Sequence, residues 1–344
     1  MSADDIVLSI RDLSVSFLTE GPTLHATDRI SFDIPKGQTV ALVGESGCGK
    51  SVTAQAVLGL LLSPPAIVES GKILFEGRDL RSLSESEMQP IRGNRIAMIF
   101  QEPMTSLNPV YTVGAQIVEA IRLHRRMTRY AAQKQAVDLL RQVGFAEPEL
   151  RAKSYPHELS GGMRQRAMIA MAISCEPMLL IADEPTTAVD MITQAQILDV
   201  LMRLQRERSM SLLLIAHDLS LVSEIAEKIV ILYAGTVVEK GPCRTLLSDP
   251  SHPYTRALLA TQPSLNDVFS RANQKSPRRL PTIAGTLPDL RSPPSGCRFH
   301  ERCEHVFERC RGEAPPMFSR GPAEVRCFLW DPSESRPNTA GPKQ

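Results

Sequence analysis

Five short runs rich in aliphatic residues divide the chain, and four of them are almost continuously apolar. They are TVALVG (39–44), RIAMIF (95–100), MLLIADE (178–184), SLLLIAH (211–217) and KIVILYAG (228–235). Continuous apolar runs of this length are typical of parallel strands that are buried on both faces. Amphipathic segments such as QAQILDVLMRLQRER (194–208) lie between them. The alternation predicts an α/β fold with a mainly parallel sheet.

The stretch from about 110 to 158 has helical spacing and few strand signals. We therefore expect an α/β core over residues 1–250, into which a helical subdomain of about 105–165 is inserted. Proline and arginine become frequent after about residue 250. This change predicts a linker into a small cysteine-bearing C-terminal extension (251–330), followed by a polar, disordered tail (331–344).

Charge and hydropathy exclude several classes of protein. The net charge is +1, so no strong field favours nucleic acid or an anionic membrane. The N-terminus lacks the pattern of a secretory signal, and no apolar run approaches the roughly 18 residues that cross a bilayer. We expect a cytosolic chain with reduced cysteines, so a cysteine cluster is more readily explained by metal binding than by disulfides.

The segment GESGCGKS matches the phosphate-loop pattern GxxxxGK[ST] between an apolar strand and a helix-compatible stretch. Glycines let backbone N–H groups converge on phosphate oxygens, and the alternative is a chance glycine-rich turn. Lys50 supplies a positive charge for the β- and γ-phosphates, and Ser51 offers a hydroxyl to Mg²⁺. The residues expected to contact the nucleotide here are Gly44, Glu45, Ser46, Gly47, Cys48, Gly49, Lys50, Ser51 and Val52.

Two adjacent carboxylates end the run LLIADE. Asp183 can hold Mg²⁺, directly or through water, and Glu184 can orient and deprotonate the attacking water. A solvated turn is the alternative, but the preceding strand is too apolar to be exposed. A second candidate phosphate-facing group of amides is Ser160, Gly161 and Gly162, which precede a helical run. An ordinary helix cap would explain these three residues alone.

Together these motifs resemble the ATP-binding cassette (ABC) transporter ATPases over about residues 5–250. The resemblance implies a Q-loop at Gln101, which contacts Mg²⁺ and the membrane subunits, and a switch histidine at His217. It also implies a D-loop aspartate at Asp190 and an adenine-stacking aromatic at Phe17, which could instead be an ordinary strand residue. The remaining implied roles are catalysis by Glu184, His217, Lys50 and Gln101, Mg²⁺ binding by Ser51, Gln101 and Asp183, and contact with the partner's ATP by Ser160, Gly161, Gly162 and Gln165.

The finer resemblance is to the D-type ATPases of oligopeptide and dipeptide importers, carried by QEPMTSLNPVYTVGAQI (101–117), LLIADEPTTAVD (179–190) and HPYTRALL (252–259). It implies a peripheral protein at the cytoplasmic face of the membrane that dimerises with a homologous F-type ATPase. Its other partners would be two transmembrane permease subunits and an external solute-binding protein, with no nucleic acid. Nickel or glutathione import remains an alternative, as does a non-transport ABC ATPase.

Four cysteines gather near the C-terminus as Cys297, Cys303, Cys310 and Cys327. Four thiolates suit a 4Fe–4S cluster or a tetrahedral Zn²⁺, and reduced, packed thiols are the third possibility. The importer ATPases that the chain resembles carry such cysteines, and some of them hold a 4Fe–4S cluster there. His300 and His305 are possible alternative ligands, and nearby arginines could offset thiolate charge. A regulatory iron–sulfur protein with a vestigial ATPase is a further alternative that the intact motifs disfavour.

Overall fold

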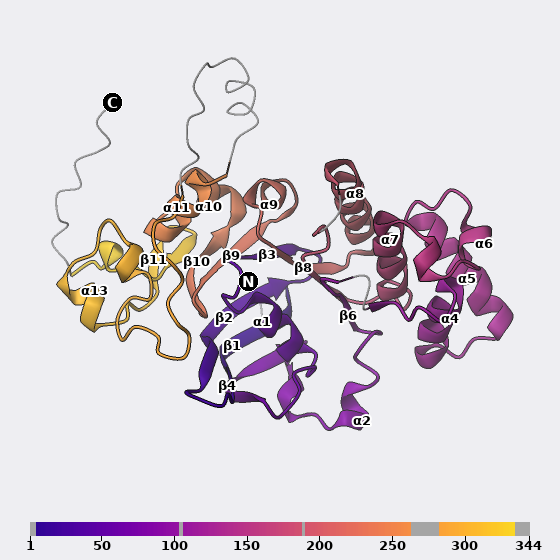
Figure 1. Ribbon diagram of the computed structural model, residues 1–344, viewed down its shortest axis with the longest axis horizontal. Helices are drawn as coiled ribbons and strands as arrows, with labels where there is room; N and C mark the ends of the chain where they lie inside the picture. Colours follow the sequence, from indigo (N-terminus) through magenta and orange to yellow (C-terminus); the bar gives the residue numbers. More distant parts are fainter. Residues whose placement is uncertain (1–4, 103–105, 188–189, 263–281, 334–344) are drawn as a thin grey trace, which may run out of the picture.

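The computed structural model describes residues 5–102, 106–187, 190–262 and 282–333. Two sheets occupy the middle of the molecule (Figure 1). The helices α4 to α7 lie at one end, and the cysteine-bearing extension lies at the other. No helix within these ranges combines the length and the apolar character that crossing a membrane requires.

The larger sheet has the strand order β11-β12-β10-β9-β3-β8-β7-β6. Its five strands from β9 to β6 are parallel, which confirms the α/β prediction. The strands are β3 (Thr39–Val43), β6 (Ile96–Ile99), β7 (Leu179–Asp183), β8 (Ser211–Ala216), β9 (Lys228–Tyr233), β10 (Thr236–Pro242), β11 (Phe318–Arg320) and β12 (Ala323–Val325). Each of the five aliphatic runs contains one of the parallel strands.

Two separate hydrophobic cores explain why these strands are continuously apolar. Successive side chains of a strand point to opposite faces of the sheet. Ala41 and Val43 of β3 belong to one core, with the helices α7 and α8. Val40 and Leu42 belong to the other core, with the second sheet. Neither face of β3 meets solvent, so all five of its residues are buried.

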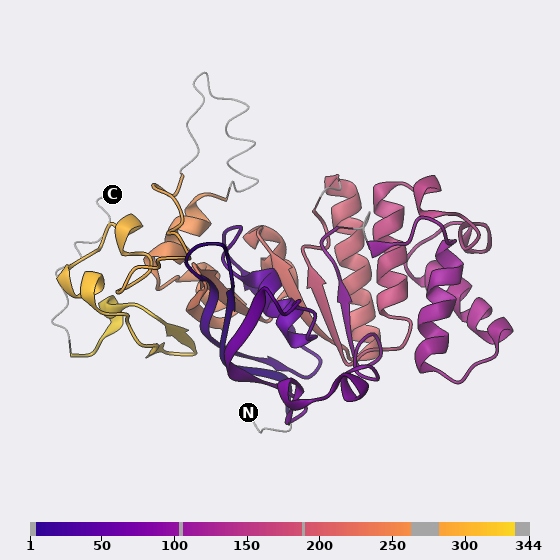
Figure 2. The ribbon, with the colours of Figure 1, turned by 60° about the horizontal axis from the view of Figure 1, so that its bottom comes forward.

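The second sheet is antiparallel and has the order β2-β1-β4-β5. It is built from β1 (Ile6–Phe17), β2 (Leu24–Pro35), β4 (Ala66–Phe75) and β5 (Arg78–Asp79). The aliphatic runs did not indicate it, because its strands mix buried with exposed residues. Its inward side chains pack on one face of the large sheet (Figure 2). Gly49, in the loop after β3, lies close to the carbonyl of Ala26 in β2.

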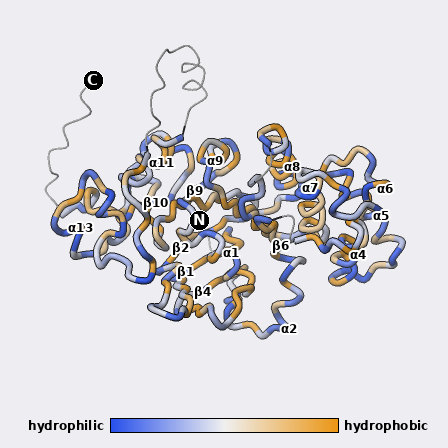
Figure 3. Tube along the Cα trace, in the orientation of Figure 1, coloured by the Kyte–Doolittle hydropathy of each residue, from blue (hydrophilic) through white to orange (hydrophobic). Residues whose placement is uncertain are grey.

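Helices cover the large sheet and form the subdomain. The helical stretch between 110 and 158 contains three α-helices, and Thr112 and Thr128 cap the first two with their side-chain oxygens. Polar and apolar positions alternate along these helices (Figure 3). The α-helices are α1 (Lys50–Val57), α2 (Glu85–Met88), α4 (Val113–His124), α5 (Arg129–Gln142), α6 (Pro148–Arg151), α7 (Gly161–Ala172), α8 (Met191–Arg208), α9 (Leu219–Ile225), α10 (Cys243–Ser248), α11 (Pro253–Ala260) and α13 (Glu308–Gly312). The short 3₁₀ helices are η2 (Leu80–Ser82), η3 (Pro156–Glu158), η4 (His300–Arg302) and η5 (Phe328–Trp330).

The C-terminal extension continues the large sheet. Strand β12 pairs with β10, where Glu239 faces Val325 and Lys240 faces Glu324, and β11 then pairs with β12. The backbone N–H of Arg326 adds a hydrogen bond to the carbonyl of Val238, at 2.8 Å. Sequence analysis predicted a small appendage beyond a linker. The described part of the extension is hydrogen-bonded to the core through these strands. The boundary near residue 250 and the disordered tail stay predictions, and the tail lies largely outside the described residues.

Candidate active site

The phosphate loop joins the end of β3 to the start of α1. Gly44 has no room for a side chain, because an added Cβ would lie 2.2 Å from the carbonyl oxygen of Leu232. Gly49 has a φ of +100°, which favours glycine, and it forms the cap of α1. Ser46 and Gly47 are exposed at the tip, so the loop backbone is open to a ligand. The local sequence therefore builds an anion site of backbone amides at a helix N-terminus.

Lys50 spans this loop. Its side chain is buried, and its Nζ donates to the carbonyls of Gly44 at 2.8 Å and Glu45 at 3.1 Å. These bonds hold the ammonium group beside the loop backbone, where it can exchange carbonyl partners for phosphate oxygens. Cys48 is also buried, and burial raises the pKa of its thiol. Cys48 can therefore contribute backbone atoms to the loop, but not an exposed side chain.

A place for a divalent cation lies beside the loop. The Ser51 hydroxyl donates to Oδ1 of Asp183 at 3.1 Å, across 132 residues of sequence. Burial raises the pKa of Asp183, and the hydrogen bond from Ser51 opposes that shift. A hydroxyl and a buried carboxylate are oxygen donors that Mg²⁺ accepts. Ser51 and Asp183 therefore fit two of the three predicted Mg²⁺ ligands. The third, Gln101, donates its hydrogen bond to Glu184, the residue that follows Asp183.

Three side chains surround the carboxylate of Glu184. Its Oε2 accepts from Nε2 of Gln101 at 3.1 Å and from the Thr187 hydroxyl at 3.0 Å, and Nδ1 of His217 lies 3.7 Å away. The Glu184 side chain is 15% exposed, whereas that of His217 is 65% exposed. A partly buried, oriented carboxylate next to the candidate Mg²⁺ ligands Ser51 and Asp183 has the geometry of a general base. Nothing in the sequence indicated that Thr187, within the segment ADEPTT, contacts Glu184.

Sheet topology explains why these residues meet. β3, β6, β7 and β8 are parallel, so their carboxyl ends share one edge of the sheet. The phosphate loop follows β3, and Gln101, Glu184 and His217 follow the other three strands. Residues that are distant in sequence therefore form a single polar group at that edge.

A second group lies at the N-termini of α7 and α8. Ser160 caps α7 by accepting from the N–H of Met163 at 3.3 Å, and Asp190 caps α8 by accepting from the N–H of Thr193 at 3.0 Å. Thr193 also packs on Gly162, where an added Cβ would lie 2.5 Å from its methyl carbon. Ser160 and Gly161 are exposed. The exposed part of this group is available to a partner.

Two further predicted residues have less direct positions. Gln165 is 2% exposed, so in this chain its side chain is buried. Phe17 ends β1, opposite Leu24 and Ala66, and is half-buried against the core. The roles of Gln165 at a partner's ATP and of Phe17 at adenine stay predictions.

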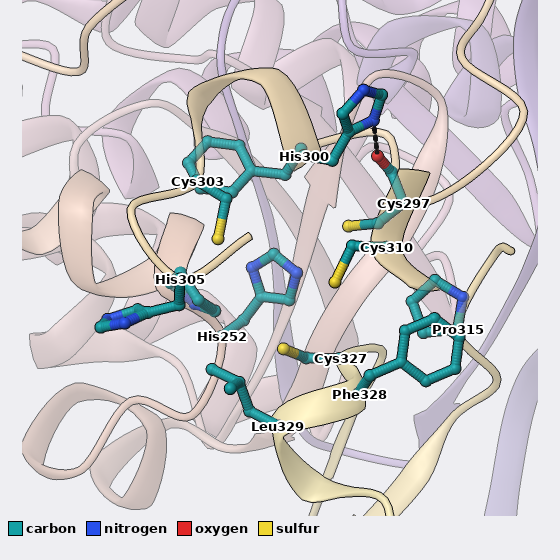
Figure 4. A pocket seen from close by; sticks show the side chains of 12 residues that line it. His252, Cys297, His300, Cys303, His305, Cys310, Pro315, Cys327, Phe328 and Leu329 are labelled. Atoms are coloured by element: carbon teal, nitrogen blue, oxygen red, sulfur yellow. Dashed lines mark hydrogen bonds between the residues drawn. The ribbon is translucent and has the colours of Figure 1, made fainter. Parts of the chain in front are cut away.

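The four C-terminal cysteines line one cavity (Figure 4). Cys303 follows η4, Cys310 lies on α13 and Cys327 precedes η5. Burial raises the pKa of Cys297 to about 11 and that of Cys327 to about 12, and it also raises the pKa of Cys303. Without a bound cation, the thiols of these three cysteines therefore stay protonated at neutral pH.

Three histidines line the same cavity. Sequence analysis considered His300 and His305 and missed His252, which precedes α11. His252 is buried and accepts the N–H of Tyr254 on Nδ1 at 3.0 Å. Burial lowers its pKa to about 3, so the ring is neutral. Its only sequence signal was its place in HPYTRALL, which gave no indication of the cavity.

The donor set favours soft metals, since thiols bind iron–sulfur clusters and Zn²⁺. Within the described ranges, no three His, Cys, Asp or Glu side chains are arranged to hold one metal ion. The neighbouring arginines were expected to offset thiolate charge, but they have other partners. Arg298 pairs with Asp28, Arg302 with Glu45 and Arg309 with Asp331, and Arg326 donates to the carbonyl of Val237. Compensation of thiolate charge by these arginines therefore stays a prediction, and the described contacts show that all four also have other partners.

Comparison with known proteins adds to this geometry. A family model described as ABC transporter matches residues 27–187, which include the phosphate loop and both carboxylates. A second model, described as Oligopeptide/dipeptide transporter, C-terminal region, matches residues 238–310. That match begins in β10 and includes three of the four cysteines of the cavity.

Similar curated proteins align over nearly the whole chain. The dipeptide transport ATP-binding protein DppD of Bacillus subtilis is 47% identical over 94% of this chain and 95% of its own length. DppD of Escherichia coli is 48% identical over 90% of this chain and 92% of its own length. The oligopeptide transport ATP-binding protein OppD of Bacillus subtilis is 47% identical over 91% of this chain and 85% of its own length.

Solved structures support the same fold. A dimeric bacterial ABC transporter cassette superposes with a TM-score of 0.62 at 25% identity, covering 69% of this chain and 99% of that one. A post-hydrolysis dimer of that cassette, bound to ADP and phosphate, gives the same values. The similarity covers about two thirds of this chain and nearly the whole of the cassette.

Proposed function

This chain belongs to the ABC transporter family of ATP-binding subunits, and we propose that it hydrolyses ATP to energise the uptake of dipeptides or oligopeptides. The observation that carries the proposal is the set of polar side chains that gather at the carboxyl ends of the parallel strands. Lys50 spans the phosphate loop, the Ser51–Asp183 pair lies beside it, and Glu184 is oriented by Gln101. These are the groups that positioning and phosphoryl transfer to water require.

The geometry supports the following division of work. Lys50 and the loop amides would bind the phosphates, while Ser51 and Asp183 would hold Mg²⁺. Glu184 accepts a proton from the attacking water, and its two hydrogen-bonded neighbours keep it aimed. His217 is mostly exposed beside Glu184 and is available to the γ-phosphate. Mg²⁺ supplies charge neutralisation of the phosphate oxygens when it is bound.

Dimerisation would give a function to the exposed residues at the N-terminus of α7. In our proposal, Ser160 and Gly161 complete the ATP site of a similar F-type ATPase, and that ATPase completes the site of this chain. ATP then favours the closed dimer and hydrolysis releases it, which is a population shift driven by ligand binding. Two permease subunits and an external solute-binding protein would complete the importer, with this chain peripheral at the cytoplasmic face of the membrane.

Transport by the assembled complex tests the proposal. The full complex in vesicles, with the binding protein outside and ATP inside, should accumulate a labelled dipeptide, and Glu184→Gln should stop uptake. Accumulation of Ni²⁺ or of glutathione, without peptide uptake, would select the alternative substrates. ATP hydrolysis that never depends on the permease would overturn the importer role and favour a non-transport ATPase.

We also propose that the four-cysteine cavity holds a 4Fe–4S cluster, ligated by Cys297, Cys303, Cys310 and Cys327. The support for the proposal is that four thiols line one cavity, a donor set that suits a 4Fe–4S cluster and would also suit a tetrahedral Zn²⁺. A bound cluster would cross-link the extension and replace the protons of the buried thiols. The cavity lies beside the core rather than in the ATP site, so a structural role is the simplest one.

Metal analysis of protein purified without oxygen tests this assignment. About four iron and four sulfide per chain are expected, together with loss of both in the double variant Cys303→Ser/Cys310→Ser. Cys243→Ser is the matched control, because Cys243 is buried in the core at the start of α10. Zinc in place of iron would select the alternative, and protein without metal would leave packed thiols.

A further inference from the structure

An arginine of the extension contacts the phosphate loop directly. Arg302 lies at the end of η4, immediately before Cys303. Its Nη1 donates to Oε2 of Glu45 at 2.9 Å and its Nη2 donates to Oε1 at 3.2 Å. Glu45 is the second residue of the loop, 257 positions away. The pair is bidentate and the Arg302 side chain is 6% exposed, so it is stronger than a surface ion pair.

Other contacts fix the guanidinium of Arg302 independently of Glu45. Its Nε donates to the carbonyl of Ala284 at 2.8 Å, and its Nη1 donates to the Tyr233 hydroxyl at 3.3 Å. The group also lies over the ring of Tyr233, with its central carbon 5.7 Å from the ring centroid. Arg302 is therefore held by the extension and by β9, and it can serve as a fixed anchor.

Glu45 is restrained at every polar group. Its carboxylate binds Arg302, its N–H donates to the Tyr254 hydroxyl at 3.0 Å, and its carbonyl accepts from Nζ of Lys50 at 3.1 Å. Tyr254 is buried and packs on Tyr233, with ring centroids 4.6 Å apart. Arg302 and the phosphate-binding lysine thus act on one residue, from its side chain and from its backbone.

We propose that Arg302 is a positioning residue for ATP binding, supplied to the phosphate loop by the C-terminal extension. It fixes the loop backbone at Glu45, and it neutralises a carboxylate that would otherwise repel the triphosphate. The inference rests on the proposed function, in which this loop binds ATP. It gives the extension a task in the nucleotide site itself, on the same segment that contributes Cys303 to the cavity.

Equilibrium titration of the full-length chain with a fluorescent ATP analogue and Mg²⁺ tests the proposal. Arg302→Met should raise the Kd about tenfold, because it removes charge-assisted hydrogen bonds and leaves Glu45 unpaired. Arg302→Lys keeps the charge but loses the bidentate geometry, and should give an intermediate Kd. In a Glu45→Gln background, Arg302→Met should change the Kd less than about threefold, because the repelling carboxylate is gone. An equal effect in both backgrounds would overturn the proposal.

Arg320→Met is the matched control. Arg320 also joins the extension to the core, through Asp249 at 2.6 Å, and its guanidinium lies over the ring of Trp330 within the extension, away from the loop. It should leave the Kd unchanged, even where it lowers the unfolding temperature as much as Arg302→Met does. An equal rise in Kd for both variants would reduce Arg302 to general stability. Lys50→Ala separates this inference from its premise. If ATP binding survives Lys50→Ala, the proposed function fails. If Lys50→Ala abolishes binding but Arg302→Met leaves the Kd unchanged, only this inference fails.

Discussion

Replacing Glu184 with glutamine should abolish ATP hydrolysis while ATP binding remains. Glutamine keeps an oxygen that can accept the hydrogen bonds from Gln101 and Thr187, so the local structure should survive. It cannot accept a proton from water at neutral pH. Loss of a general base lowers a rate by about 10²–10⁴-fold, or about 3–5 kcal/mol in the activation barrier. The free energy of unfolding should change little, because the hydrogen bonds to this side chain are kept.

Phosphate release by the assembled complex measures the rate, and titration with an ATP analogue measures the affinity. Glu207→Gln is the control, because Glu207 lies on α8 with 57% of its side chain exposed and only a loose ion pair with Arg203 at 3.7 Å. It should hydrolyse ATP at the original rate. A rate within about threefold of the original for Glu184→Gln would refute its assignment as the base, because an effect that small is outside the range for a general base.

Three further outcomes are expected. Gly162→Ala should destabilise the chain by about 1–3 kcal/mol in thermal unfolding, because its Cβ would meet Thr193, whereas Gly161→Ala has open space and should not. Ser51→Ala should raise the Mg²⁺ concentration needed for half-maximal hydrolysis, and an unchanged requirement would remove Ser51 from the cation site. Metal-free protein should lose stability in denaturant titrations from about pH 9 upward, since Cys327 ionises near pH 9 when unfolded but near 12 when folded. Cys327→Ser should lose less over that range; an equal loss would contradict this.

The sequence was informative where local physics decides the structure. A phosphate loop needs glycine where Leu232 leaves no space and where φ is positive, so Gly44 and Gly49 stand in the sequence as a readable motif. The five parallel strands were visible because both of their faces are buried. The order of the motifs then indicated the family, and the matching family models and relatives confirmed it.

Contacts between distant segments were less visible. The antiparallel sheet was missed because its strands are only partly buried, so they lack a continuous apolar run. The cysteine spacing predicted a cluster site but gave no indication of His252, which lines the cavity from its position just before α11. Arginines near those cysteines suggested charge compensation for thiolates, whereas the fold turns four of them toward other partners.

The sequence by itself therefore determined the five parallel strands, the phosphate loop and the family, and it predicted roles for Asp183 and Glu184, because each of these depends on neighbours within a few residues. Only the tertiary structure decided that the extension adds strands to the core sheet and that Arg302 reaches Glu45. The pairing of β12 with β10 and the contact between residues 257 positions apart depend on which distant segments the fold brings together. No local pattern of polarity encodes that arrangement.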